Sequence, residues 1–264
     1  MTGVLDHGYI KLIDHMGDDE AIVESARMST DGSFRGWGPV CDECAPSGFK
    51  KDPKKMVLEN CIECGRMGTL KALSVWQGDE TFIKFLWVNR HTSPFEVAAA
   101  TFEMKLPIMV VREWHRHRTQ SYNEVSARYT ALPNDNYAPT LTRLMLNANT
   151  SNRQANKADG VPDLTETEAN KWLSMLSDSY DYAESVYQYG LSVGVPKELA
   201  RLPVPVGRYT KMRASANLLN WLRFLGLRMH GRAQWEIRMY ALMVCQELSK
   251  VFPRTMAAFD AANV

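Results

Sequence analysis

The chain has 264 residues, of which 45% are hydrophobic and 23% charged, and its formal net charge is +1. These values are ordinary for a soluble globular protein, and a charge near zero gives no general field that would hold nucleic acid or a membrane. No apolar run approaches the ~20 residues of a membrane span, and the N-terminus lacks the parts of a signal peptide. We therefore expect a cytoplasmic protein that binds neither nucleic acid nor membrane.

The N-terminal part of the chain predicts alternating strands and helices. Residues 9–13 read as a strand, and a helix is expected from about Asp18 to Met28, because acidic residues favour the positive end of a helix. A second helix is expected at about residues 70–89, with Gly78 as the point where it could break. Residues 95–106 end in alternating apolar and charged positions and predict a strand. Pro107 then opens a helix on which Arg112 and Arg116, four apart, share a face.

The C-terminal half is predicted to be mostly helical. Residues 133–162 read as a polar connection with room for one short helix, and Thr165 with Glu168 fits a capping box. Further helices are expected at 196–201, 214–227 and 232–251, with Cys245 in the core. The helix after the capping box carries an aromatic stripe that we expect in the core, formed by Trp172, Leu176, Tyr180, Ala183 and Tyr187.

These elements predict an α+β fold in a single domain over residues 1–264. Its centre is a mixed or antiparallel sheet with flanking helices. A small metal-binding insertion is expected within it at about residues 30–68.

The metal-binding insertion is predicted from four of the five cysteines, because they form two C-x-x-C pairs. The spacing is typical of a structural zinc site with four thiolates, and a segment rich in glycine, proline and lysine would need the metal to fold. Two disulfides or a redox dithiol are the alternatives, but zinc is favoured in an intracellular chain. The predicted Zn²⁺ ligands are Cys41, Cys44, Cys61 and Cys64.

Residues 116–129 contain three arginines, a histidine, two serines, an asparagine and a glutamate, with little apolar material to bury. Buried charges are rare unless they are paired, so the segment lies in solvent or lines a site. Arginine matches phosphate with two parallel donors, which favours a site for an anion. On composition alone, an exposed basic loop that touches nucleic acid is an equal alternative.

The segment resembles the signature of the flavin-dependent thymidylate synthases, read as Arg-His-Arg-x-x-Ser-x-Asn-Glu-x-Ser-x-Arg-Tyr with every fixed position filled. The blocks at residues 91–96, 195–201 and 227–236 resemble further family segments in the same order. The resemblance covers most of the chain from about Asp6 to Phe259. It leaves out the cysteine-rich insertion and the loop around 140–165.

The resemblance implies reductive methylation of dUMP to dTMP by a homotetramer. Methylenetetrahydrofolate would be the carbon donor, and FAD reduced by NADPH would supply the hydride. It implies that Arg228 activates the uracil by favouring negative charge on the ring, without an enzyme nucleophile. The implied dUMP-binding residues are Glu113, Arg116, Glu124, Ser126, Arg128, Arg201 and Arg228; for Ser126, turn stabilisation is the alternative role. The implied FAD-binding residues are Ser93, Arg116, His117, Arg118, Glu124, Asn217 and Arg223.

Three positions depart from the family pattern: Leu219 stands where an arginine is common, Arg223 where an asparagine is expected, and Arg232 where a histidine is expected. They leave the nearby flavin contacts uncertain. Two alternative functions stay open at this point. One is a zinc-ribbon protein that binds nucleic acid, and the other is a non-catalytic relative that binds flavin or nucleotide.

Overall fold

The computed structural model describes residues 2–40, 76–146 and 163–262. The chain divides into two compact units, which are described separately below. The first comprises Met1–Asp14, Thr101–Ala216 and Arg223–Val244, and the second His15–Ala100, Asn217–Leu222 and Cys245–Val264. Among the described residues, no helix is long and apolar enough to cross a membrane.

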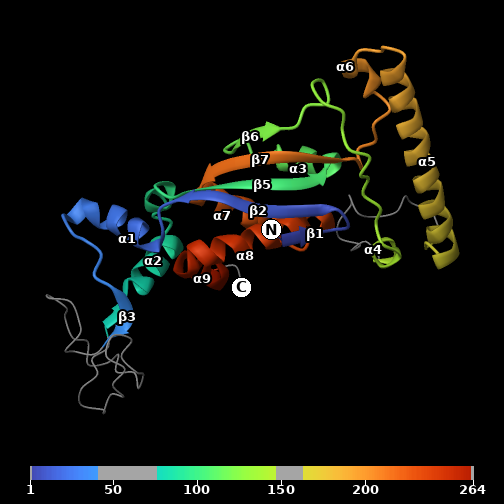
Figure 1. Cartoon of the computed structure of the whole chain (residues 1–264). Helices are drawn as coiled ribbons and strands as arrows, with labels where there is room; N and C mark the ends of the chain where they lie inside the picture. The colour runs from blue at the N-terminus through green and yellow to red at the C-terminus, as the bar shows by residue number, and fades with distance from the viewer. Residues whose placement is uncertain (1, 41–75, 147–162, 263–264) are drawn as a thin grey trace. The chain divides into compact units, whose positions relative to one another are not determined.

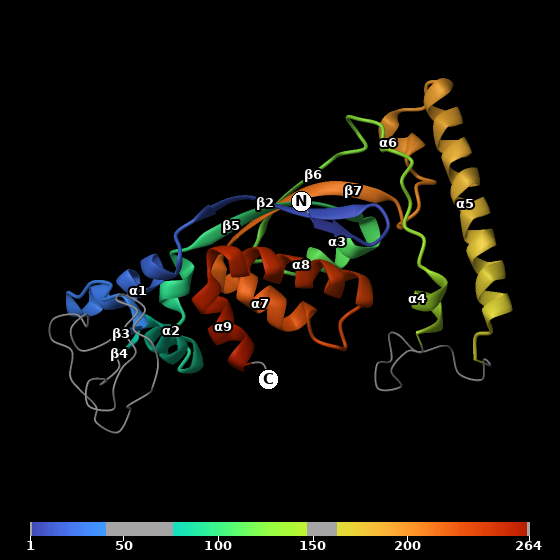
Figure 2. The same ribbon diagram turned by 60° about the horizontal axis from the view of Figure 1, so that its bottom comes forward.

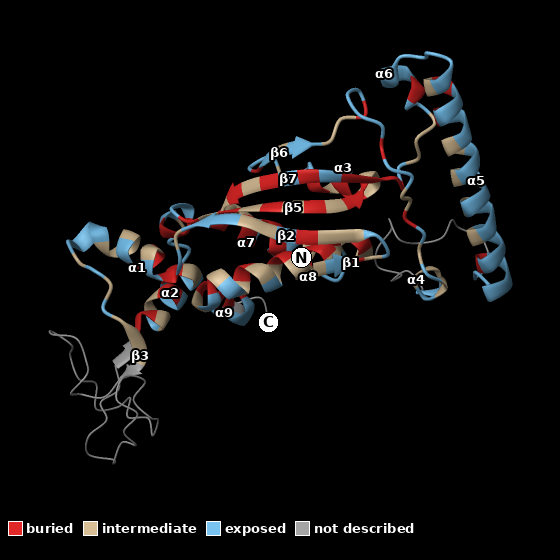
Figure 3. Ribbon diagram, viewed as in Figure 1, coloured by how far each residue is buried: buried red, intermediate tan, exposed pale blue. Residues whose placement is uncertain are grey.

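The first unit is built on a five-stranded sheet with the order β1-β2-β5-β7-β6 (Figure 1). β1 pairs with β2, and β6 with β7, in antiparallel register. Alternate residues of β5 and β7 are buried (Figure 3), as the two-residue period of a strand requires. The strands are β1 (Thr2–Val4), β2 (Gly8–Met16), β5 (Ala99–Pro107), β6 (Ser121–Glu124) and β7 (Tyr209–Asn217).

The first unit also contains helices, one of which packs on the sheet. α8 (Trp235–Val251) lies along one of its faces (Figure 2), where the Tyr240 hydroxyl donates a hydrogen bond to the carbonyl oxygen of Lys105 at 2.8 Å. The other helices of the first unit are α3 (Ile108–Trp114), α4 (Leu141–Met145), α5 (Glu166–Ser192), α6 (Lys197–Ala200) and the end of α7 (Leu218–Arg228). α5 begins with the predicted capping box of Thr165 and Glu168.

The second unit is mainly helical. The buried carboxylate of Asp19 accepts hydrogen bonds from the backbone of Arg254 and from the backbone and hydroxyl of Thr255, which ties the first helix to the last. The elements of the second unit are α1 (Asp19–Arg27), η1 (Met28–Thr30), β3 (Trp37–Val40), β4 (Trp76–Gly78), α2 (Asp79–Val88), η2 (Ser93–Glu96) and α9 (Pro253–Ala262), with the start of α7 and the end of α8.

The α+β class is confirmed, but four local predictions need correction. Residues 214–217 end strand β7 rather than begin a helix, and α2 begins only after Gly78, whose φ of 75° suits glycine. α3 ends at Trp114, so Arg116 does not share a helix face with Arg112. The stripe on α5 is not uniformly core, because Trp172 is 46% exposed whereas Tyr187 is fully buried.

The four cysteines of the predicted zinc site lie within residues 41–75, outside the described residues. The zinc insertion therefore stays a prediction. Cys245 is half-buried on α8, and burial raises the pKa of its thiol.

Candidate active site

Arg228, at the end of α7, is the centre of a polar cluster with two residues of the signature region. Its Nε donates to His117 Nε2 at 2.8 Å. Its Nη1 donates to Glu113 Oε2 at 3.0 Å, and its Nη2 donates to the Glu113 carbonyl oxygen at 2.9 Å. α3 supplies Glu113, and the turn that follows it supplies His117. The structure thus joins Arg228 to two predicted site residues that stand more than a hundred positions earlier in the sequence.

His117 is neutral in this cluster. Burial, with the nearby positive charge of Arg228, lowers the pKa of its imidazole from 6.5 to about 4, and Glu113 opposes this only in part. A neutral imidazole has one acceptor nitrogen, and the Arg228 contact identifies it as Nε2. The ring also lies edge-on to Phe224, with 4.8 Å between ring centroids. His117 therefore acts as a hydrogen-bond acceptor that holds the Arg228 guanidinium in place.

The turn that carries His117 is held by its neighbours. The buried Trp114 indole donates to Gln120 Oε1 at 3.0 Å, and its ring stacks on Phe224 with centroids 4.4 Å apart. The Tyr122 hydroxyl lies 2.7 Å from the His117 carbonyl oxygen and 3.1 Å from that of Trp114. Burial raises the pKa of Tyr122 to about 12, so the hydroxyl stays a donor at neutral pH.

Arg116 and Arg118 flank His117 and are exposed. Neither guanidinium forms a hydrogen bond or ion pair with any residue in the described ranges. Arginine stays charged at any working pH, so both offer their donors to solvent or to a ligand. This part of the signature is suited to binding an anion.

A pocket of about 280 Å³ opens beside the second half of the signature. Glu124 and Arg201, both predicted site residues, line it together. Arg112 and Thr210 also line it, although the predicted site included neither. Arg112 stands on α3 next to Glu113, and nothing in its sequence context distinguishes it from a surface arginine. The rest of the lining is apolar: Ile108, Val125, Ala127, Leu132, Leu202, Val204 and Val206.

α6 approaches the end of the signature. Arg128 Nε lies 3.6 Å from Glu198 Oε2, with both side chains more than half exposed, so this pair contributes little stability. The Ser126 hydroxyl accepts a hydrogen bond from the Arg128 amide at 3.3 Å, which is the turn-stabilising role that we considered for it. Arg201, at the end of α6, donates from Nε to the Glu198 carbonyl oxygen at 3.3 Å.

The other predicted flavin contacts are divided between the two units. Ser93 and Asn217 belong to the second unit, where Asn217 Oδ1 accepts from the Asn220 amide at 3.0 Å. Arg223 is exposed on α7. Leu219 is 2% exposed, so this departure from the family pattern is a core residue. Arg232 is exposed, and its amide donates to His230 Nδ1 at 3.1 Å.

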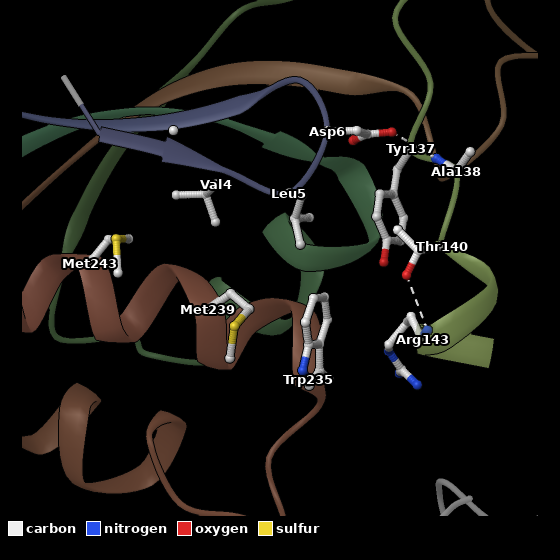
Figure 4. Close-up of a pocket in the computed structure, with 11 residues that line it drawn as sticks. Val4, Leu5, Asp6, Tyr137, Ala138, Thr140, Arg143, Trp235, Met239 and Met243 are labelled. Carbon is white, nitrogen blue, oxygen red and sulfur yellow. Dashed lines mark hydrogen bonds between the residues drawn. The ribbon is translucent and has the colours of Figure 1, made fainter. Parts of the chain in front are cut away.

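A larger pocket, of about 380 Å³, lies between the N-terminal hairpin and α8 (Figure 4). Met239, Met243 and Trp235 line it, and its two charged residues are already bonded. Asp6 accepts from the Ala138 amide and the Tyr209 hydroxyl, and Arg143 donates to Glu236 at 2.8 Å. The charge of Arg143 is compensated by Glu236, and Asp6 is itself an anion, so we do not place the anion site here.

Comparison with known proteins agrees with the signature. A family model described as "Thymidylate synthase complementing protein" matches residues 11–254. Flavin-dependent thymidylate synthases of Thermus thermophilus and Pseudothermotoga lettingae are 34% and 32% identical to the chain. Each alignment covers 97% of this chain, with 77% of the Thermus and 91% of the Pseudothermotoga protein.

The fold has a solved counterpart as well. A UMP/dUMP methylase, PolB from Streptomyces cacaoi bound with 5-Br dUMP, superposes with a TM-score of 0.73 at 27% identity, over 99% of this chain and 98% of that one. The same methylase bound with 5-Br UMP gives a TM-score of 0.71, over 98% of this chain and 96% of that one. These matches do not favour a zinc-ribbon protein that binds nucleic acid. The chain belongs to the flavin-dependent thymidylate synthase family.

Proposed function

We propose that the chain converts dUMP to dTMP, with FAD as bound cofactor, NADPH as reductant and methylenetetrahydrofolate as carbon donor. The observation that carries the proposal is the Arg228 guanidinium, held by His117 and Glu113 near two arginines that pair with no described residue. Family membership and the likeness to a dUMP methylase support the same reaction.

Arg228 is the proposed activating residue. Arginine has five N–H donors, and the contacts to His117 and Glu113 use three of them, which leaves two. A fixed cation with free donors stabilises negative charge that develops on a bound uracil, and this makes C5 of the ring more nucleophilic. Because its side chain is only 17% exposed, the group is held before the substrate arrives.

The donors around His117 fit a flavin dinucleotide. Arg116 and Arg118 are the residues that would hold its pyrophosphate, since arginine matches phosphate oxygens bidentately and both side chains lack partners in the described part of the chain. When bound, the flavin would supply the hydride that turns the transferred methylene into a methyl group. Because His117 is neutral, the positive charge between Arg116 and Arg118 comes from the two arginines alone.

The nucleotide is proposed to bind on the other side of the signature. Arg201 and Glu124 line the pocket there, and Ser126 and Arg128 stand on the segment that forms its edge. Guanidinium groups suit a phosphate monoester, and the Glu124 carboxylate suits a sugar hydroxyl or a ring N–H.

We propose self-association, with a homotetramer as the expected state, on the strength of α5. Five large apolar residues on it, and Val193 at its C-terminal cap, are between 40% and 73% exposed. They recur at alternating steps of three and four residues, with Ser179 at the one interruption, which is the repeat of a helix–helix seam. The six are Trp172, Met175, Tyr182, Val186, Tyr189 and Val193.

The direct test is dTMP formation from dUMP, methylenetetrahydrofolate, NADPH and FAD. We expect Arg228→Ala to abolish turnover while the protein stays folded. Arg228→Lys should retain a small fraction of it, because lysine keeps the charge but loses the planar fork. Arg213→Ala is the matched control: this exposed arginine pairs with Glu103 and forms no contact with His117 or Glu113 among the described residues.

Wild-type protein that binds FAD and dUMP but forms no dTMP would indicate the non-catalytic relative instead. Full turnover by Arg228→Ala would refute the activating role while leaving the reaction itself intact. Loss of turnover in Arg213→Ala as well would point to general damage to the fold.

A further inference from the structure

The pocket beside Glu124 contains two guanidinium groups without an ion pair. Arg112 forms no hydrogen bond or ion pair with any described residue, and within the same ranges the Arg201 guanidinium donates only to a backbone carbonyl of its own helix. Glu124, the one carboxylate in the lining, forms no ion pair within the described ranges either. Two guanidinium groups against one carboxylate leave the lining with a net positive charge, which favours an anion as the ligand.

Thr210 provides an independent sign of a missing partner. It lines the same pocket, is 4% exposed, and its Oγ1 is buried without a hydrogen-bond partner among the described residues. A buried hydroxyl that stays unpaired is destabilising, and such groups in native proteins usually have a partner. The hydroxyl stands at the start of β7 on the wall of the pocket, so a ligand bound there could supply that partner.

On the basis of the proposed function, we propose that Arg112 and Thr210 belong to the binding site for the dUMP phosphate, together with Arg201. The Arg112 guanidinium binds phosphate oxygens opposite Arg201, and the Thr210 hydroxyl donates a hydrogen bond to the same group. Val125 and Ala127, on either side of Ser126, also line the pocket, which places it at the half of the signature expected to face the nucleotide. Arg116 and Arg118 are not part of the lining, which assigns the flavin pyrophosphate elsewhere.

The test compares ligands with and without phosphate on the FAD-loaded protein. Equilibrium binding of dUMP and of 2′-deoxyuridine is measured for the wild type and for Arg112→Met, which keeps the apolar stem and removes the charge. We expect dUMP to bind about 10- to 100-fold more weakly and deoxyuridine to bind as before, since a hydrogen bond to a charged group is lost only where there is phosphate. Lys84→Met removes one exposed charge on α2 and should change neither affinity.

Thr210 allows a matched pair of variants. Thr210→Val removes the hydroxyl at nearly constant shape and should weaken dUMP binding about 3- to 10-fold, while the ligand-free protein unfolds at the same or a higher urea concentration. Thr210→Ser keeps the hydroxyl and should retain dUMP affinity. A hydroxyl with a purely structural role would instead lower the stability of Thr210→Val without changing its dUMP affinity.

Three results would overturn the proposal. One is a folded Arg112→Met variant that binds dUMP within twofold of the wild type. Another is an equal loss of dUMP and deoxyuridine binding. The third is weaker FAD binding with unchanged dUMP binding, which would assign the pocket to the flavin. If the wild type binds no dUMP, the proposed function fails, and inorganic phosphate becomes the probe: weaker phosphate binding by Arg112→Met supports the anion site, and equal binding removes it.

Discussion

Acidification should destabilise the flavin-free protein through His117. Burial and the Arg228 charge hold the pKa of this imidazole at about 4, against 6.5 for the ordinary group. Between pH 6.5 and 4 the unfolded chain therefore binds a proton that the folded chain does not, so the free energy of unfolding falls as the pH falls. Above pH 6.5 both states are neutral at this residue, and its contribution is constant.

The size of the effect follows from that difference. A shift of 2.5 pKa units, 6.5 minus 4, corresponds to about 3 kcal/mol at ~1.4 kcal/mol per unit. This is an upper bound, because the ring is only partly buried and solvent screens its interaction with Arg228. We expect His117 to remove about 1 to 2 kcal/mol of stability between pH 7 and pH 4.

Urea unfolding at a series of pH values measures this, with His117→Gln as the reference variant. Glutamine keeps an acceptor for Arg228 but does not titrate, so the difference between the two proteins isolates the imidazole from carboxylates such as Asp19. The two stability curves should converge as the pH falls if the variant is the less stable protein at pH 7. Parallel curves down to pH 4 would refute the low pKa.

A second variant separates the two causes of the shift. Arg228→Met removes the nearby charge and leaves the ring half-buried, so the pKa of His117 should rise but stay below 6.5, because burial is the larger cause. The pH dependence of this variant should lie between those of the wild type and His117→Gln. A dependence equal to that of His117→Gln would show that charge, rather than burial, sets the pKa.

Two further predictions concern the proposals on assembly and zinc. Tyr182→Glu with Tyr189→Glu places charges in the exposed apolar row of α5 and should reduce the molar mass measured by light scattering. Ser177→Glu, at an exposed position about 140° around the same helix from Tyr182, should leave it unchanged, and a wild type that is already monomeric would contradict the assembly proposal. Protein purified without chelators should contain one zinc per chain, and Cys41→Ser with Cys44→Ser should lose it; a metal-free wild type would rule the site out.

The signature can be recognised in the sequence, whereas some of the elements that carry the candidate site are mispredicted. The residues of the signature were recognisable because arginine, histidine and glutamate are chemically distinctive at fixed spacing. Strand β7 was missed at Ala214 and Ala216, since alanine favours a helix, whereas here both alternate with exposed or half-buried residues in a paired strand. Trp172 belongs to an apolar face that the sequence predicts from its helical spacing. Spacing alone does not show whether the same chain or a second chain covers that face.

Other features lay beyond any local pattern. The Arg228 cluster joins residues more than a hundred positions apart, and only the family resemblance connected them in advance. Arg112 and Thr210 are ordinary residues in ordinary contexts, so their meeting in one pocket required the fold.

The arginines of the first unit differ in how firmly they are held, and this difference matches their proposed tasks. Arg228 is bonded through three donors and is 17% exposed, so its charge has a fixed direction before any ligand binds. A group that must stabilise charge as it develops on a ring benefits from such preorganisation, because no reorganisation is then needed during the reaction. Arg112, Arg116 and Arg118 are exposed and without partners in the described part of the chain. They can adjust to a flexible phosphate, where affinity matters more than exact direction. Neutral His117 makes this division workable, because a protonated imidazole would have no acceptor for Arg228 and would repel it.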